Sequence, residues 1–112
     1  MFALIAAKQA IEQSNYSSSD SGVIVGTGVG GMHTLEEEHS KYIKKGQRGV
    51  SPFYVPKMIP NIAGGQIAIK NNLTGLNFSM STACSSATDA IGMAYRLILS
   101  LIHISEPTRP SV

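Results

Sequence analysis

The single cysteine of the chain, Cys84, is the residue best suited to do chemistry. It stands in the segment STACSSATDAIG (residues 81–92), between an apolar stretch typical of a strand and an apolar-periodic stretch typical of a helix. The N–H groups and the dipole at the start of a helix favour the thiolate, which is the nucleophilic form of cysteine. The same N–H groups can stabilise the oxyanion that forms when a thiolate attacks a thioester carbonyl. Position alone leaves a second interpretation open, in which Cys84 is a small buried hydrophobic residue.

A second candidate site is the glycine-rich segment GTGVGG. Gly26, Gly28 and Gly31 fit the spacing G-x-G-x-x-G of dinucleotide-binding turns, after a predicted strand and before a predicted helix. The full pattern needs a second strand about 20 residues later that ends in an acid, and this chain has GQRGVSPFY there. Glu36–Glu38 come too early and lie on a helix. The preferred interpretation is that the glycines let a tight turn approach a neighbouring backbone or a ligand chain.

The histidines are weaker candidates. His33 and His39 lie six positions apart on the predicted helix after the glycines, so they do not share a face cleanly and are expected to be solvated. His103 lies in the last segment of the chain, for which no role is expected. No metal site and no cofactor-binding residue is predicted.

The elements that must position these residues alternate between helices and strands. Helices are predicted over residues 2–13, 32–46 and 61–70 and from Cys84 or Ser85 onward, and strands over residues 22–28, buried on both faces, and 78–83. Residues 46–60 contain three prolines, which exclude a central strand and a continuous helix and predict a rigid irregular arm. The order of elements predicts an α/β layer architecture. The last helix is expected to bury a stripe formed by Ala87, Ala90, Ile91, Ala94, Leu97 and Ile98.

Length and composition exclude several classes of protein. The 112 residues, 43% of them hydrophobic, suffice for one small domain. The net charge of +2 offers no basic stripe for nucleic acid or acidic lipid. One cysteine cannot form an internal disulfide, and no apolar run reaches the roughly 18 residues of a membrane span. These features predict a soluble, cytoplasmic protein that binds neither nucleic acid nor membrane.

Two longer segments resemble the N-terminal half of the β-ketoacyl-acyl carrier protein synthases of the type II kind. They are GVIVGTGVGGM and the stretch from VSPFYVPKMIPNIAGG to TACSSATDAIGMAYRLI, and the resemblance runs from about Phe2 to Ile98. It implies a thiolase-like fold, an αβαβα layered sandwich of which this chain holds part of the N-terminal half. It also implies an acyltransferase that condenses malonyl units onto an acyl chain in fatty-acid synthesis, with acyl carrier protein as partner, a homodimeric parent and no cofactor beyond the carrier's phosphopantetheine.

The resemblance also assigns roles to individual residues. It implies that Cys84 takes the acyl group as a thioester and that its own N–H forms part of the oxyanion hole. Val29 matches a position that gates the acyl pocket. Phe53, Tyr54 and Val55, on the proline-rich arm, match residues that pack at the dimer interface and help line the partner's pocket.

Parts of the family pattern are missing from this chain. The family pairs its cysteine with two histidines and a lysine from its second half, so the chain alone is expected to be inactive and, with apolar helix faces uncovered, poorly soluble or molten. Residues 99–112, LSLIHISEPTRPSV, resemble a translated sequencing adapter, so residues 1–98 are expected to be native and 99–112 to be a non-native tail. Two alternatives remain: a non-catalytic synthase-like dimer partner in a polyketide system, against which Cys84 argues, and a dinucleotide-binding module.

Overall fold

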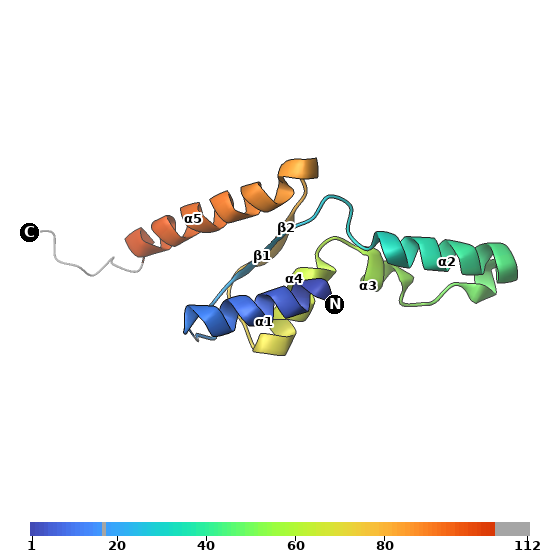
Figure 1. Ribbon diagram of the computed structural model, residues 1–112, viewed down its shortest axis with the longest axis horizontal. Helices are drawn as coiled ribbons and strands as arrows, with labels where there is room; N and C mark the ends of the chain where they lie inside the picture. Colours follow the sequence, from blue (N-terminus) through green and yellow to red (C-terminus); the bar gives the residue numbers. More distant parts are fainter. Residues whose placement is uncertain (17, 105–112) are drawn as a thin grey trace, which may run out of the picture.

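The computed structural model describes residues 1–16 and 18–104, the last four of these by their backbone alone. Helices and strands follow one another as predicted and make the chain a mixed α/β structure (Figure 1). The elements are α1 (Phe2–Ser14), β1 (Val23–Gly26), α2 (Met32–Lys45), the 3₁₀ turn η1 (Gly46–Gly49), α3 (Tyr54–Met58), α4 (Ile62–Asn71), β2 (Asn77–Met80), the 3₁₀ turn η2 (Ala83–Ser85) and α5 (Ser86–Ile104).

β1 and β2 form a two-stranded parallel sheet in which Val23 pairs with Asn77 and Gly26 pairs with Met80. Within residues 1–16 and 18–104, helices α4 and α5 both contact the two strands and do not contact each other, so they cover opposite faces of the sheet. This is the layered arrangement of an α/β protein. The prediction that the first strand is buried on both faces holds only for Val23, because β1 has a neighbouring strand on one edge alone among the described residues.

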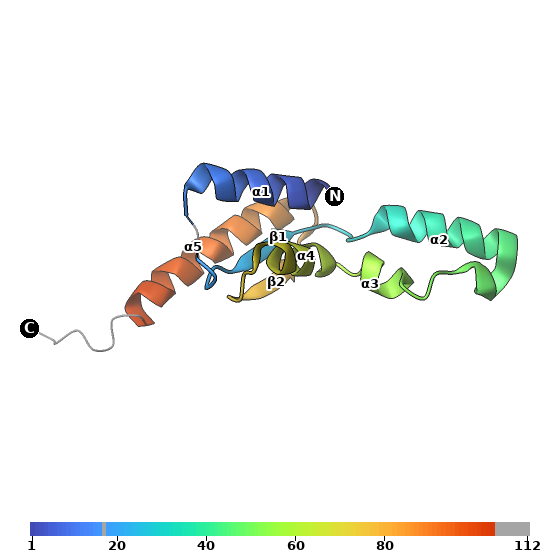
Figure 2. The same ribbon diagram turned by 90° about the horizontal axis from the view of Figure 1, so that it is seen from below.

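Helix α2 and the arm of residues 46–60 that follows it, with the turn η1 and helix α3, extend away from the sheet together, as both views show (Figures 1 and 2). α2 ends at Lys45, one residue before the predicted end, and is capped by Gly46, whose φ of 66° suits glycine and few other residues. The prediction of an irregular arm is wrong for residues 54–58, which form the short helix α3. Pro56 is the third residue of this helix, where its missing N–H has no intrahelical partner to lose.

Helix α5 covers only half of the predicted stripe: Ala90, Ala94 and Leu97 are buried or half-buried, whereas Ala87, Ile91 and Ile98 are exposed. Ala90 is buried as expected, whereas Ile91 is 72% exposed and Ile98 is 60% exposed. A two-stranded sheet is too narrow to cover the whole apolar side of a helix, so only the residues directly above it are covered. The covered or half-covered residues of α5 are Ser86, Asp89, Ala90, Met93, Ala94 and Leu97.

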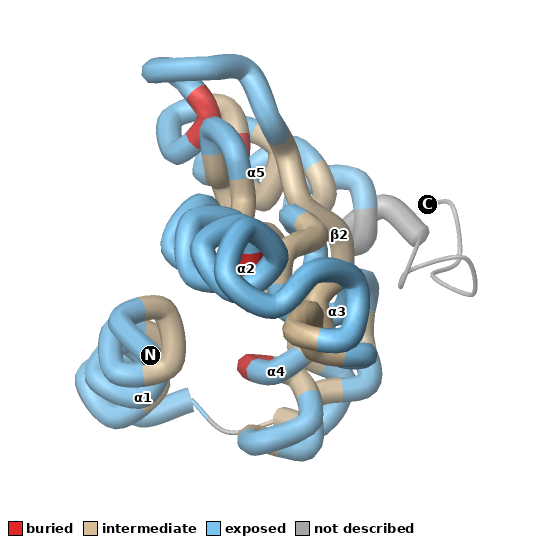
Figure 3. Tube along the Cα trace, turned by 90° about the vertical axis from the view of Figure 1, so that its right-hand side faces the viewer, coloured by how far each residue is buried: buried red, intermediate tan, exposed pale blue. Residues whose placement is uncertain are grey.

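The core of the described part of the chain is small. Its buried hydrophobic residues are Val23, Ile67 and Ala90, and Figure 3 shows buried positions only at isolated points of the trace. The accessible surface is 8781 Å², whereas a compact protein of 11.9 kDa exposes about 6000 Å². Large apolar side chains such as Phe2, 85% exposed, therefore face solvent.

Candidate active site

Cys84 lies in the tight turn that joins the sheet to the last helix. The chain leaves β2 at Met80, forms η2 over Ala83–Ser85 and enters α5 at Ser86. The predicted helix start at Cys84 or Ser85 is therefore wrong, whereas the position of the cysteine between a strand and a helix is confirmed. Cys84 is exposed, so the interpretation as a small buried hydrophobic residue does not fit this structure.

The residue before the cysteine has an unfavourable backbone conformation that hydrogen bonds hold in place. Ala83 has a φ of 51°, and the left-handed region costs a non-glycine residue about 1–2 kcal/mol. The N–H and the hydroxyl of Ser86 both donate to the Ala83 carbonyl, the hydroxyl at 2.7 Å. The same hydroxyl accepts the Thr82 N–H at 2.9 Å. Strained backbone fixed by its surroundings is concentrated at functional sites, which supports a role for this turn.

A second polar network ties the turn to the first turn of α5. Asp89 Oδ2 accepts a hydrogen bond from the Thr82 hydroxyl and lies 3.2 Å from the Ser85 hydroxyl. The Ser85 hydroxyl also donates to the Thr82 carbonyl at 2.7 Å. Among the backbone hydrogen bonds of the described turns, none uses the Cys84 N–H. The turn is thus fixed on both sides of Cys84 while this donor stays available to a ligand.

The glycine-rich segment packs directly against the cysteine turn and the arm. A Cβ at Gly26 would lie 2.3 Å from the backbone oxygen of Ser86, far inside contact distance. Gly30 has a φ of 87°, and a Cβ at Gly31 would lie 2.5 Å from the Lys57 oxygen. These glycines therefore let a tight turn approach neighbouring backbone, as the preferred interpretation of the sequence stated.

Three N–H groups of the same segment, those of Thr27, Gly30 and Gly31, already have partners within the protein. The Gly31 N–H donates to the Met58 carbonyl at 2.8 Å, and the Gly30 N–H donates to the Thr27 hydroxyl at 3.1 Å. The Thr27 N–H donates to the Met80 carbonyl at 3.0 Å. A dinucleotide-binding turn directs such N–H groups at the pyrophosphate. The geometry therefore does not support the dinucleotide-binding alternative.

The structure brings the segment of Val29 beside the segment of Cys84. The Ser81 hydroxyl donates to the Gly28 carbonyl at 3.0 Å, and a Cβ at Gly28 would lie 3.9 Å from the Ala83 oxygen. Val29 itself is 65% exposed. The two candidate motifs of the sequence are thus one structural unit, in which the glycine turn lies against the cysteine turn.

The arm residues Phe53, Tyr54 and Val55 lie apart from this unit. Phe53 is 63% exposed and Val55 is 55% exposed, whereas Tyr54 is half-buried. Helix α3, which begins at Tyr54, contacts α2 and α4 but neither η2 nor α5. Within the part of the chain that the structure describes, these residues therefore do not meet Cys84.

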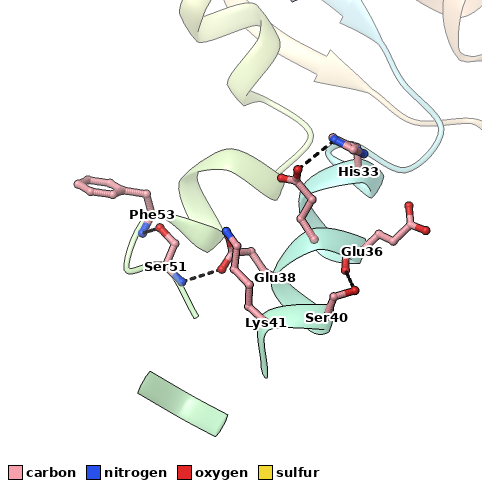
Figure 4. A network of polar contacts seen from close by, with 8 residues as sticks. His33, Glu36, Glu38, Ser40, Lys41, Ser51 and Phe53 are labelled. Atoms are coloured by element: carbon pink, nitrogen blue, oxygen red, sulfur yellow. Dashed lines mark hydrogen bonds and ion pairs between the residues drawn. The ribbon is translucent and has the colours of Figure 1, made fainter. Parts of the chain in front are cut away.

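A buried carboxylate, which the sequence did not single out, anchors the arm. Glu38 of α2 is 4% exposed and accepts hydrogen bonds from Lys41 Nζ at 2.7 Å and from the Ser51 N–H at 2.6 Å (Figure 4). The hydrogen bond from Lys41 and, to a smaller extent, that from Ser51 lower the pKa of Glu38, and the hydrogen bond to Glu38 raises the pKa of Lys41. No sequence signal separates Glu38 from the neighbouring Glu36 and Glu37, because only the fold of the arm selects it.

The two histidines whose side chains the structure describes, His33 and His39, show no sign of a site. His33 Nε2 lies 3.3 Å from Glu37 Oε1 with its side chain 84% exposed, and His39 is exposed, as predicted for solvated helix residues. The side chain of His103 lies outside the described residues.

In the described ranges no three metal-binding side chains come together. None of the helices between residues 1 and 104 is both long and apolar enough to cross a bilayer.

Comparison with known proteins places these features in a family. The profile described as "Beta-ketoacyl synthase, N-terminal domain" matches residues 1–101. The 3-oxoacyl-[acyl-carrier-protein] synthase 2 of Staphylococcus aureus strain N315 is 38% identical over 102 residues, which cover 87% of this chain and 25% of the relative. The synthase 2 of Vibrio cholerae matches with the same identity and coverage. The chain thus spans about a quarter of the length of these relatives.

Proposed function

The chain belongs to the β-ketoacyl synthase family, and from that premise we propose that it is the amino-terminal part of a 3-oxoacyl-acyl carrier protein synthase in which Cys84 accepts the acyl chain. One observation carries the assignment of the residue. The only cysteine of the chain is exposed on a turn at the amino end of α5 that hydrogen bonds hold in place. The backbone N–H of Cys84 makes none of the hydrogen bonds found in the described turns.

The proposed reaction begins with acyl transfer to the cysteine. The Cys84 thiolate attacks the carbonyl carbon of an acyl thioester carried on the phosphopantetheine of acyl carrier protein. The Cys84 N–H donates to the developing oxyanion, and the carrier's thiolate leaves and takes up a proton. Malonyl-carrier protein then loses carbon dioxide, and the resulting carbanion attacks the Cys84 thioester and releases the thiolate. No cofactor other than the carrier's phosphopantetheine takes part in this scheme.

This chain supplies only the acyl-accepting part of the scheme. The resemblance assigns the decarboxylation to two histidines and a lysine of the second half, and the exposed His33 and His39 are poor substitutes because neither lies at the cysteine turn. We therefore expect the chain by itself not to catalyse condensation.

The proposed fold is the thiolase-like αβαβα sandwich, with this chain as part of its first half. The support is the parallel pair β1–β2 with α4 on one face and α5 on the other, which reproduces one sheet and its two helical layers. We propose that residues 1–98 form this part and that residues 99–112 are a non-native tail; the family match ends at residue 101. Sequencing the gene across residue 99 tests that boundary.

The proposed partners are acyl carrier protein and a second copy of the full-length synthase. Phe53, Tyr54 and Val55 would pack at the interface between the copies and help line the partner's acyl pocket. The exposed side chains of Phe53 and Val55 on a projecting arm support this assignment. Val29, on the glycine turn beside Cys84, would gate the acyl pocket, and its exposed side chain leaves it accessible to an acyl chain. We expect the synthase to act in the cytoplasm.

The test uses a hybrid synthase in which residues 1–98 replace the segment that they match in the Staphylococcus aureus relative. The hybrid is incubated with acyl carrier protein that bears an acyl group as a thioester. Peptide mass spectrometry should then find this acyl group on Cys84. The variant Cys84→Ser should lose this adduct and at least 1000-fold of condensing activity, since a neutral hydroxyl is a much weaker nucleophile than a thiolate. A folded hybrid that carries no acyl group on Cys84 would contradict the proposal. A non-catalytic polyketide partner would give that result.

A further inference from the structure

The side chain of Ser86 is the most buried polar group next to the cysteine turn. The residue is 3% exposed, and its hydroxyl has two backbone partners. It accepts the Thr82 N–H at 2.9 Å and donates to the Ala83 carbonyl at 2.7 Å. Thr82 and Ser86 are the two ends of the turn that contains Cys84. One hydroxyl therefore closes the turn around the cysteine.

The backbone of Ser86 is held as firmly as its side chain. It packs against Gly26 of β1 so closely that a methyl group on Gly26 would overlap the Ser86 oxygen. The Ser86 N–H donates to the same Ala83 carbonyl that accepts its hydroxyl. Ala83 needs such support because its φ of 51° lies in a region that alanine rarely adopts. Ser86 thus connects the sheet, the strained residue and the start of α5.

We propose that Ser86 is a positioning residue for Cys84, whose hydroxyl fixes the turn so that the Cys84 sulfur and the Cys84 N–H meet an acyl thioester together. This inference rests on the proposed function of Cys84. Ser86 touches neither substrate nor the reacting sulfur in this scheme. It acts through the geometry of the two backbone groups it binds. Misplacement of the oxyanion donor slows acyl transfer without altering the thiol itself.

A comparison within the same turn sharpens the assignment. The hydroxyls of Ser85 and Ser86 both donate to a carbonyl of the turn, at the same distance of 2.7 Å. Ser85 is exposed and shares Asp89 with Thr82, so water can replace its bonds. The buried hydroxyl of Ser86 has no such replacement. Removal of the Ser86 hydroxyl should therefore disturb the turn much more than removal of the Ser85 hydroxyl.

The experiment compares two reactions of Cys84 in the hybrid synthase. An oxyanion forms when Cys84 takes the acyl group from acylated carrier protein, whereas none forms when iodoacetamide alkylates Cys84. Ser86→Ala should slow acylation of Cys84 at least tenfold while the alkylation rate, measured from pH 6 to pH 9, changes less than threefold. Ser86→Thr, which keeps the hydroxyl, should restore at least half of the acylation rate. Ser85→Ala should slow acylation less than threefold.

A distant serine with the same type of bond serves as control. The Ser40 hydroxyl donates to the Glu36 carbonyl on α2 at 2.9 Å, so Ser40→Ala should leave both reactions unchanged. Equal losses of acylation and alkylation in Ser86→Ala, together with a lower melting temperature, would mean a purely structural role and overturn the proposal. Unchanged acylation in Ser86→Ala would also overturn it. Failure of the unsubstituted, folded hybrid to acylate at Cys84 would instead refute the proposed function.

Discussion

The cysteine turn and the arm differ in how many contacts within this chain hold them in place. The cysteine turn is closed by hydrogen bonds to Thr82, Ala83 and Asp89 and by backbone contact with Gly26. The arm has one buried anchor, the carboxylate of Glu38. A turn that needs a fixed geometry for chemistry is thus built from short local contacts. The arm leaves apolar side chains such as Phe53 and Val55 exposed, which is typical of a surface that binds a partner.

The largest expected effect concerns the molecule as a whole. The isolated chain should show no cooperative transition in scanning calorimetry and should bind the dye ANS, because the three buried hydrophobic residues of its described part cannot offset the conformational entropy of a chain of this length. The hybrid synthase, in which the relative covers the exposed faces, should melt cooperatively and bind little dye. A sharp two-state transition of the isolated chain would contradict this prediction. It would also contradict the difference between the cysteine turn, which this chain holds in place, and the arm, which it leaves largely exposed.

The next largest effect should come from the contact between the glycine turn and the cysteine turn. In the hybrid, Gly26→Ala places a methyl group 2.3 Å from the Ser86 oxygen, so β1 and α5 must separate. We expect a loss of about 3 kcal/mol of stability, since overpacking against backbone has little room to relax. Acylation of Cys84 should fall about 100-fold, because the turn moves with the helix.

A second glycine provides the matched control for this substitution. Among the described residues no atom lies within 4 Å of a Cβ placed at Gly92 on α5, so Gly92→Ala clashes with neither β1 nor the cysteine turn; it should leave acylation unchanged and stabilise the helix by up to about 1 kcal/mol. Chemical denaturation and acylation kinetics measure both variants. Equal tolerance of alanine at Gly26 and Gly92 would show that the two turns are not one mechanical unit.

The sequence predicted the elements well because their signals are local. The apolar periodicity of α5, the glycine after α2 and the β-branched run of β1 are each decided within a few residues. The position of Cys84 between a strand and a helix followed from the same signals. A resemblance to the family added the chemical role, which no local pattern specifies.

The errors of the sequence prediction arose where distant segments decide. Ile91 fits the apolar stripe of α5 by spacing but is exposed, because the width of the sheet beneath the helix decides which residues are covered. In the sequence Ser86 is one of several small residues near Cys84, and only the approach of β1 buries its hydroxyl against the cysteine turn. Glu38 is indistinguishable from Glu37 until the arm brings Ser51 to it. Such contacts depend on three-dimensional proximity rather than on spacing.

The smallest effect tests the anchor of the arm through pH. Hydrogen bonds from Lys41 and Ser51 lower the pKa of Glu38 below its ordinary 4.5, so its stabilisation of the arm is complete above pH 4.5 and is lost as pH falls through the lowered value. The raised pKa of Lys41 acts at the other end: its contribution is complete below pH 10.5 and is lost as pH rises through the raised value. The anchor should therefore hold between about pH 5 and pH 10.

Amide hydrogen exchange of residues 46–58 in the hybrid, corrected for intrinsic rates, measures this anchor. At pH 7, Glu38→Gln should speed exchange in this segment a few-fold, because a neutral amide accepts the Ser51 N–H more weakly and cannot pair with Lys41. Its residual protection should not change between pH 5 and pH 3, whereas that of the unsubstituted protein should fall. Glu36→Gln, on the exposed side of α2, should behave as the unsubstituted protein. Equal protection of this segment in Glu38→Gln and in the unsubstituted protein would contradict the prediction and would mean that contacts other than those of Glu38 hold the arm.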